Sequence, residues 1–202
     1  MIYIQDNFLP QDEFLALRDR CERRFIAKDG WGKEPVRVTH HDAKGDWNEG
    51  CNFLGRECVS PTRKIIATLE ELGVTELVNW SIWFQYIINK MTVIPHRDGG
   101  LRFSERKDTY TALLYTSDWQ DGWGGEFIVG QPVYVGPGHP VGLTDLTHTI
   151  KPIPNRLLIW SRDEWHAVNE VTHDDPDYKR SFYGTGWSSI SSPNVNFDGA
   201  IQ

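Results

Sequence analysis

The segment WSIWFQYII, residues 80–88, decides the fold class of this sequence. Residues 80, 82, 84, 86 and 88 form one alternating set and residues 81, 83, 85 and 87 form the other, and both sets include large apolar side chains. Alternate residues of a strand point to opposite faces, so the segment predicts a strand with two partly buried faces. Further β-rich runs follow at 109–116, 126–129, 133–135, 157–160 and 181–183, with Gly and Pro between them. Many short strands with frequent turns indicate a sandwich or barrel.

Before residue 80 the pattern is helical. Residues 10–28 place Phe14, Leu17, Cys21 and Phe25 at spacings that suit an amphipathic helix beginning at Pro10. A second helix is predicted from an N-cap at Ser60 and a first-turn Pro61 to about Leu72, ending at Gly73. Residues 29–56 are rich in Gly, Asp, Asn and Trp and predict a long irregular loop. The expected fold is mainly β: a small helical N-terminal part packed on an antiparallel double-sheet barrel.

Composition excludes several classes of partner. The chain has 202 residues, 21 Lys and Arg against 28 Asp and Glu, a formal net charge of −7 and a pI near 5.5. This balance disfavours nucleic acid and anionic membranes as partners, because both require a basic surface. Three cysteines without a CxxC pair indicate reduced thiols, and no signal peptide is visible at the start of the sequence. We therefore expect a cytoplasmic protein.

One histidine has a distinctive setting. His96 and Asp98 are two residues apart in an extended segment, so their side chains point to the same side. His166 follows the apolar run 157–160 and is the best third ligand for a metal. Two histidines and one carboxylate on one face of an ion are the arrangement of non-haem Fe(II) oxygenases. His173 competes with His166, but it lies in a polar run that no strand precedes.

The remaining histidines have simpler interpretations. The triplet His40-His41-Asp42 could bind a metal, but a solvated loop is the simpler interpretation. His139 and His148 are expected to face solvent or to bond to backbone groups. No glycine pattern typical of a phosphate-binding loop is present, and Gly124-Gly125 predicts a tight turn.

The order of motifs around His96 carries a family resemblance. The runs LYTSDW at 114–119, WGGEF at 123–127 and PNRLLIW at 154–160 are followed by His166 and then by Lys179-Arg180. In this order the sequence resembles the 2-oxoglutarate- and Fe(II)-dependent oxygenases, in particular the prolyl 4-hydroxylase-like branch. The resemblance implies a double-stranded β-helix and a single domain over residues 1–202, with a catalytic core at about 80–190. It also implies Fe(II) held by His96, Asp98 and His166, with 2-oxoglutarate and O2 as co-substrates and ascorbate as a reductant.

The resemblance also requires a cation for the far carboxylate of 2-oxoglutarate. Arg180 offers a planar fork for this role, whereas prolyl 4-hydroxylases use a lysine, so Lys179 stays an alternative. Strand alternation allows only one of these two neighbours to face the interior. Tyr86 stands about where the family has a tyrosine that helps to hold 2-oxoglutarate, although the Gly usual shortly after it is Asn89 here.

The implied activity is hydroxylation of an unactivated C–H bond with release of succinate and CO2. The substrate could be a prolyl residue, a free amino acid or another small metabolite. The rival interpretation is a non-catalytic barrel that binds a sugar or small ligand, with a structural metal at most. The joint presence of the His-x-Asp motif, the later histidine and the basic residue favours the enzyme, because a binding module needs no such set.

Overall fold

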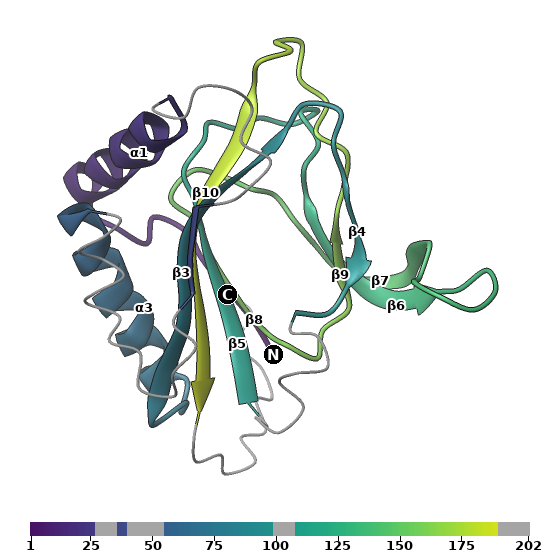
Figure 1. The fold of residues 1–202 in the computed structure, drawn as a ribbon, viewed down its shortest axis with the longest axis horizontal. Coiled ribbons are helices and arrows are strands. Elements are labelled where there is room, and N and C mark those ends of the chain that lie inside the picture. The colour runs from purple at the N-terminus through teal and green to yellow at the C-terminus, as the bar shows by residue number, and fades with distance from the viewer. Residues whose placement is uncertain (27–35, 40–54, 99–107, 190–202) are drawn as a thin grey trace.

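The computed structural model describes residues 1–26, 36–39, 55–98 and 108–189. Two antiparallel sheets form the body of the protein: six strands in the order β1-β8-β5-β10-β3-β2, and four strands in the order β4-β9-β6-β7. Helices α1 (Gln11–Ile26) and α3 (Val59–Glu71) cover one side of the six-stranded sheet, and the four-stranded sheet lies on its other side (Figure 1). This is the mainly β, double-sheet fold that the sequence predicts.

The strands of the six-stranded sheet are β1 (Ile2–Gln5), β2 (Val36–Thr39), β3 (Leu77–Ile88), β5 (Asp108–Tyr115), β8 (Leu157–Ser161) and β10 (Lys179–Ser189). Those of the four-stranded sheet are β4 (Val93–His96), β6 (Phe127–Val133), β7 (Gly142–Ile150) and β9 (His166–Val168). The longest pairing joins β10 to β3, from Lys179 opposite Ile88 to Ser189 opposite Leu77.

The second helix begins differently from the prediction. A short 3-10 turn, η1 (Arg56–Cys58), precedes α3, and the N-cap residue is Cys58 rather than Ser60. The Ser60 hydroxyl does not cap the helix but donates a hydrogen bond to Oε2 of Glu13 at 2.5 Å, which ties α3 to α1. The helix ends before Gly73, whose φ of 81° suits a residue without a side chain.

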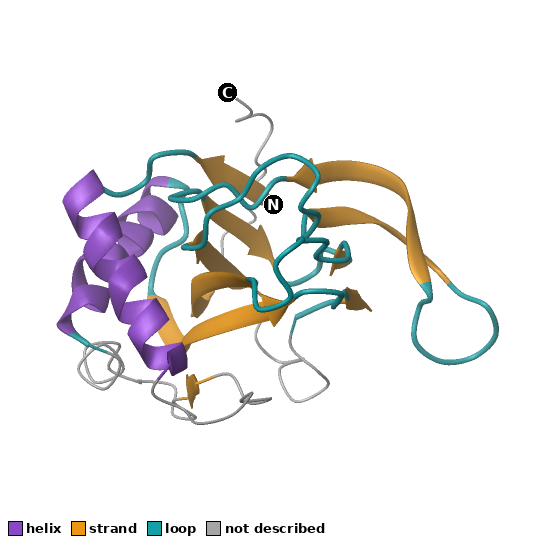
Figure 2. Ribbon diagram, turned by 90° about the horizontal axis from the view of Figure 1, so that it is seen from above, coloured by secondary structure: helices purple, strands orange, loops and turns teal. Residues whose placement is uncertain are grey.

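Two β elements depart from the predicted pattern. Part of the expected loop, residues 36–39, forms strand β2 against β3, and the rest of that loop, with His40-His41-Asp42, lies outside the described residues. Strand β6 spans Phe127–Val133, so it joins the run predicted at 126–129 to the first residue of the run predicted at 133–135, and Tyr134 and Val135 lie beyond it. It forms a projecting hairpin with the unpredicted β7 (Figure 2). Most β7 side chains are exposed, so this edge strand has no alternating apolar pattern from which a strand could be predicted.

The six-stranded sheet has an apolar cluster on each face. Phe84 and Tyr183 point toward the helices and pack with residues such as Leu17 and Leu69. Their chain neighbours Trp83 and Phe182 point toward the four-stranded sheet and pack with Tyr115, Phe127, Trp160 and others. None of the described helices is long and apolar enough to cross a membrane.

Candidate active site

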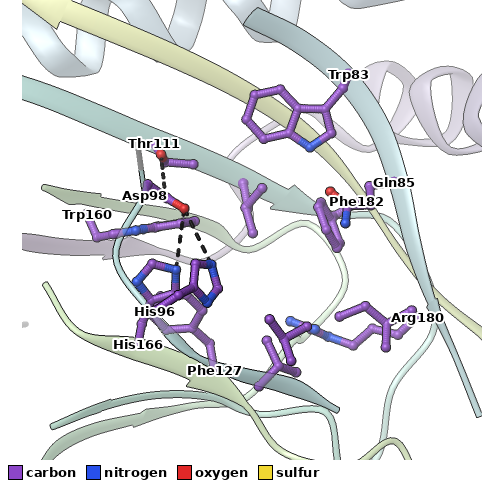
Figure 3. A pocket seen from close by; sticks show the side chains of 14 residues that line it. Trp83, Gln85, His96, Asp98, Thr111, Phe127, Trp160, His166, Arg180 and Phe182 are labelled. Atoms are coloured by element: carbon purple, nitrogen blue, oxygen red, sulfur yellow. Dashed lines mark hydrogen bonds and ion pairs between the residues drawn. The ribbon is translucent and has the colours of Figure 1, made fainter. Parts of the chain in front are cut away.

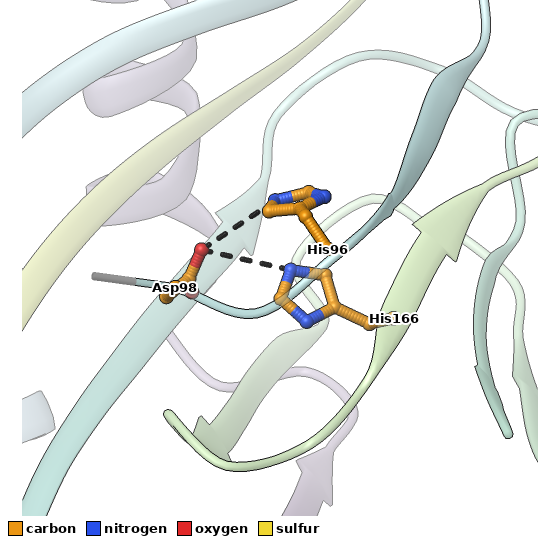
Figure 4. Close-up of side chains that lie close together, drawn as sticks. All are labelled: His96, Asp98 and His166. Atoms are coloured by element: carbon orange, nitrogen blue, oxygen red, sulfur yellow. Dashed lines mark ion pairs between the residues drawn. The ribbon is translucent and has the colours of Figure 1, made fainter. Parts of the chain in front are cut away.

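The three candidate metal ligands meet where the two strands β4 and β9 adjoin. His96 ends β4, His166 begins β9, and the two are register partners in the four-stranded sheet. Asp98 lies two residues beyond His96, and its Oδ1 atom is 3.6 Å from Nε2 of each histidine (Figure 4). The ligand atoms of the three residues all lie within 4.8 Å of one another. Such a cluster can hold a metal ion on one face and leave the opposite positions open.

Hydrogen bonds fix which ring nitrogen of each histidine is available. Nδ1 of His96 lies 2.8 Å from the carbonyl oxygen of Ile94, and Nδ1 of His166 lies 2.9 Å from that of Glu164. A carbonyl can only accept, so each Nδ1 carries the proton and donates it. In the neutral rings Nε2 is then left as the lone-pair donor for a metal, on the side that faces Asp98.

Asp98 is oriented by a hydroxyl from the six-stranded sheet. The Thr111 hydroxyl on β5 donates to Oδ2 of Asp98 at 2.7 Å, so Oδ1 is left to face the two histidines. Burial alone would raise the pKa of Asp98, but the contacts with His96, His166 and Thr111 outweigh it and the pKa is lowered. The carboxylate is therefore ionised near neutral pH.

The pKa values of the two histidines are shifted in opposite directions. The contact with Asp98 raises the pKa of His96, whereas burial is the main cause that lowers the pKa of His166. His166 has almost no exposure, with Phe127 stacked on it at 4.9 Å between ring centroids and Trp160 edge-on at 5.2 Å. A neutral His166 next to an ionised Asp98 is the protonation state that a divalent metal requires.

A cavity of about 270 Å³ opens between the two sheets and includes the metal-ligand cluster (Figure 3). Its walls are mostly apolar and aromatic, which is typical of small-molecule sites. The lining residues are Trp83, Gln85, Ile87, Val93, His96, Asp98, Thr111, Leu113, Phe127, Trp160, His166, Val168, Arg180 and Phe182.

Arg180 lies in this cavity, away from the metal-ligand cluster (Figure 3). Its side chain is buried, at 1% relative exposure, and none of its guanidinium nitrogens has a hydrogen-bond partner among the described residues. Burial lowers its pKa. A buried cation without an anion is costly, and unsatisfied buried donors are rare in native proteins. A carboxylate ligand in the cavity would satisfy both the charge and the donors, so the residues present fit a dicarboxylate that extends from Arg180 to the metal.

Lys179, the alternative cation, points to the other side of β10. Its Nζ lies 5.4 Å from the centre of the Tyr86 ring, and neither residue lines the cavity. The position of Tyr86 therefore gives no support to its expected role in holding 2-oxoglutarate. On β3 the cavity-facing residues are Trp83, Gln85 and Ile87.

Sequence reasoning missed a tyrosine that lies next to Arg180. Tyr115 at the end of β5 has its ring centre 4.9 Å from Cζ of Arg180, and its buried hydroxyl has no partner within the described part of the chain. Burial raises its pKa, so the hydroxyl stays protonated and can donate to a carboxylate. The alternation of 109–116 was a usable signal, since Thr111, Leu113 and Tyr115 share a face.

The glycine pair Gly124-Gly125 lies against the backbone of Glu170 and the side chain of Arg180. Both glycines have positive φ, +66° and +75°, which L side chains rarely adopt. A Cβ added at Gly124 would collide with the carbonyl oxygen of Glu170, and one at Gly125 would lie 2.8 Å from Cδ of Arg180. The tight turn lies just before the predicted position, where the Trp123 N–H donates to the Gln120 carbonyl oxygen, and Gly124 pairs with Val171. The missing side chain of Gly125 makes room for the aliphatic part of Arg180.

The competing histidines lie elsewhere. The His173 ring stacks on Tyr178 at 4.2 Å, and its Nδ1 accepts the backbone N–H of Asp175 at 2.8 Å. Nδ1 of His148 lies 3.0 Å from the Thr147 hydroxyl, and His139 is exposed. None of the three lines the cavity.

Comparison with known proteins places the chain in a family. The family model of the 2OG-Fe(II) oxygenase superfamily matches residues 83–188, which hold the whole cluster described above. No curated protein matched the sequence.

Solved structures share the fold at low identity. A prolyl-4-hydroxylase from Pseudomonas putida is 19% identical over 95% of this chain and 93% of its own, with a TM-score of 0.60. HygX from Streptomyces hygroscopicus, solved with nickel and 2-oxoglutarate bound, is 12% identical over 94% and 83%, with a TM-score of 0.68. A Trichoplax adhaerens prolyl hydroxylase, in complex with a hypoxia inducible factor peptide, is 15% identical over 93% and 82%, with a TM-score of 0.59.

The chain belongs to the 2OG-Fe(II) oxygenase superfamily. It is an Fe(II)- and 2-oxoglutarate-dependent dioxygenase, and its fold is that of the prolyl 4-hydroxylase-like enzymes, as the sequence resemblance indicates.

Proposed function

We propose that this protein hydroxylates an unactivated C–H bond at the cavity between its sheets, with His96, Asp98 and His166 as the iron ligands and Arg180 as the anchor of 2-oxoglutarate. The observation that carries the proposal is the pairing, in one cavity, of a ligand cluster with a buried and unpartnered guanidinium. Either feature alone would suit proteins with many different roles, but together they match a dicarboxylate that reaches from a metal to a cation.

The chain's residues have distinct tasks in this proposal. The Nε2 atoms of His96 and His166 and Oδ1 of Asp98 hold the metal, and Thr111 keeps Asp98 turned toward it. When bound, Fe(II) and 2-oxoglutarate supply the oxidising chemistry, in which one atom of O2 enters the substrate and the other enters succinate as CO2 is lost.

At the other end of the cavity, Arg180 binds the far carboxylate of 2-oxoglutarate, and the Tyr115 hydroxyl donates to it. The charges in the cavity then balance. Fe(II) contributes +2, Asp98 −1, 2-oxoglutarate −2 and Arg180 +1, which sum to zero. A neutral assembly suits this partly dry site, whereas in the ligand-free cavity Arg180 is a buried cation with no anion hydrogen-bonded to it among the described residues.

The wall of the cavity also limits the substrate. Its titratable side chains, among the described lining residues, are the three metal ligands and Arg180. The rest of the described wall is apolar except for Gln85, Thr111 and two indoles. A free amino acid would bring an ammonium and a carboxylate close to the reacting carbon, with no described partner for either. A prolyl residue within a peptide brings only neutral amides, so we favour a peptidyl substrate over a free amino acid.

The similarity to prolyl hydroxylases supports the same choice. One of the similar solved structures holds a peptide fragment of hypoxia inducible factor. Ascorbate as a reductant and a cytoplasmic location stay predictions, as does the extent of the catalytic core at about 80–190.

A binding titration tests the proposal. Fe(II) added anaerobically should bind, and further addition of 2-oxoglutarate should give a visible metal-to-ligand charge-transfer band. Proline-containing peptides and free proline are then compared by 2-oxoglutarate consumption and by the mass gain of one oxygen atom. A band that does not form contradicts the site assignment, and turnover of free proline but not of peptides contradicts the substrate class.

A further inference from the structure

Trp160 has a buried hydrogen-bond donor that the proposed roles leave without a partner. It lies near the end of β8, it is 3% exposed, and its Nε1 atom makes no hydrogen bond to any described residue. An indole N–H can only donate. Burying such a donor unpaired lowers the stability of the folded protein, so native proteins rarely keep one unless a ligand, a water molecule or local strain accounts for it.

The position of Trp160 identifies what the N–H faces. Trp160 lines the same cavity as the metal-ligand cluster, and on the six-stranded sheet it is the register partner of Thr111. Paired residues of an antiparallel sheet point to the same face with their Cβ atoms about 4.5–5.5 Å apart. Thr111 donates to Asp98, so the indole lies next to the residue that orients a metal ligand. Figure 3 labels Trp160, Thr111 and Asp98 among the side chains that line the cavity.

None of the described groups around Trp160 accepts a hydrogen bond from its N–H. Asp98 uses Oδ2 for Thr111 and directs Oδ1 to the two histidines. His166 donates its Nδ1 proton to Glu164 and directs Nε2 toward Asp98. The Trp160 ring itself is held in place by His166 and by Phe127, whose ring centre is 4.7 Å away. The donor is thus fixed beside the cluster and unused.

We infer that the Trp160 N–H donates a hydrogen bond to an oxygen atom that binds the metal at one of its open positions. This inference rests on the proposed function, because it requires a metal at the His96, Asp98 and His166 cluster. The acceptor is an oxygen of the metal-chelating end of 2-oxoglutarate or a water molecule on the metal, and both have the same chemistry toward an indole N–H.

The cavity then has donors at both of its ends. Arg180, with the Tyr115 ring packed against it, serves one carboxylate of 2-oxoglutarate, and Trp160 serves the metal end. A dicarboxylate would satisfy all three unpartnered groups in one binding step. The acceptor is negatively charged if it is the chelating carboxylate, and a hydrogen bond to a charged group is stronger than a neutral one. Trp160 would therefore contribute to co-substrate binding as well as to the shape of the wall.

The test replaces Trp160 by Phe, which keeps an aromatic ring against His166 and Phe127 but removes the N–H. Trp187→Phe is the matched control, because Trp187 is equally buried but donates to the Thr185 hydroxyl at 2.8 Å on the helix side of the sheet. For both variants and the unchanged protein, we would measure the dissociation constants of Fe(II) alone and of 2-oxoglutarate with Fe(II) present, without oxygen. Urea unfolding of the ligand-free protein accompanies each measurement.

If the acceptor is the co-substrate, Trp160→Phe weakens 2-oxoglutarate binding about tenfold and leaves Fe(II) binding unchanged. If the acceptor is water, Fe(II) binding weakens instead. In both cases the ligand-free Trp160→Phe protein loses packing but no hydrogen bond, so it should be destabilised less than Trp187→Phe, which loses both. Trp187→Phe should leave the binding of both ligands unchanged.

Equal binding of both ligands by Trp160→Phe and the unchanged protein would overturn the inference, and Trp160 would then be a packing residue only. Failure of the unchanged protein to bind Fe(II) and 2-oxoglutarate is a separate result, since it contradicts the proposed function itself.

Discussion

The two faces of the six-stranded sheet treat buried polar groups in opposite ways. On the helix side, the Tyr183 hydroxyl lies 2.6 Å from that of Thr62, and the hydroxyls of Thr116 and Ser181 lie 2.8 Å apart. On the cavity side, Tyr115, Trp160 and Arg180 have buried donors with no described partner. On the helix side these hydroxyls are paired within the protein, whereas on the cavity side the described donors are left unpaired and would be satisfied by the proposed ligand. Alternate residues of the same strands supply the paired hydroxyls on the helix side and the unpaired donors on the cavity side.

Of all substitutions on the cavity side, the removal of a metal ligand should have the largest effect on activity. We expect Asp98→Ala to abolish 2-oxoglutarate turnover and to weaken Fe(II) binding by at least about tenfold, because one of three protein ligands is lost. The ligand-free protein should stay folded, since Asp98 is not part of either apolar cluster. His173→Ala is the control and should bind Fe(II) normally. Undiminished succinate formation by Asp98→Ala would refute the assigned ligand set.

The anchor of the co-substrate should show the next largest effect. Arg180→Ala leaves the far carboxylate of 2-oxoglutarate unpaired, so its binding should weaken by about 2–5 kcal/mol. Arg180→Lys should recover only part of this loss, because an ammonium cannot make a two-pronged contact. Lys179→Ala, which removes the neighbouring cation on the other face, should change little. Anaerobic titration with Fe(II) present measures all three, and a large loss in Lys179→Ala alone would contradict the assignment.

A pair of identical substitutions compares the two faces directly. The Thr62 hydroxyl donates to the carbonyl oxygen of Cys58, so Tyr183 must donate to Thr62. Tyr183→Phe should therefore lower the free energy of unfolding by about 1 kcal/mol and leave 2-oxoglutarate binding unchanged. Tyr115→Phe should do the reverse: unchanged stability without ligand, and 2-oxoglutarate binding weaker by about tenfold. Urea unfolding and the anaerobic titration distinguish them, and equal behaviour of the two variants would remove the contrast between the faces.

The smallest effect is expected at a cysteine on the helix side. Burial raises the pKa of Cys21 to about 12, so at pH 8 only about one thiol in 10⁴ is ionised, and the thiolate is the reactive form. The native protein should therefore leave Cys21 unmodified by iodoacetamide at pH 8, and urea should expose it. Peptide mass mapping measures this, and rapid native labelling of Cys21 would show that the helix layer opens.

The metal-ligand cluster was accessible to sequence reasoning because its geometry is local. The spacing of two residues placed His96 and Asp98 on one side, although β4 ends at His96 and Asp98 lies in a bend just beyond it. Alternation within β10 separated Arg180 from Lys179. The fold class was accessible for a similar reason, since the period of two in 80–88 is strong. His166 was proposed because it follows the apolar run 157–160, and the order of motifs in the family resemblance supported it, although no local rule connects it to His96 across 70 positions of sequence.

The site residues that the sequence did not predict depend on which face of each strand points into the cavity. Both alternating sets of β3 are apolar enough to be buried, so the pattern could not show that Gln85 rather than Tyr86 faces inward. Tyr115 was missed because its role depends on a neighbour 65 residues later in the chain. The N-cap prediction at Ser60 failed because Glu13, on another helix, engages its hydroxyl.

The hydrogen bonds of the two histidines have a consequence for how this enzyme could vary. Each ring is held by the carbonyl two residues before it, so its tautomer and direction are specified within a three-residue segment of its own chain. The orientation of each histidine ring therefore depends on a hydrogen bond within its own three-residue segment and not on the sequence of the loops. The metal site could thus be inherited unchanged while the connections that meet the substrate lengthen, shorten or change chemistry, and one barrel could acquire new substrates without rebuilding its centre.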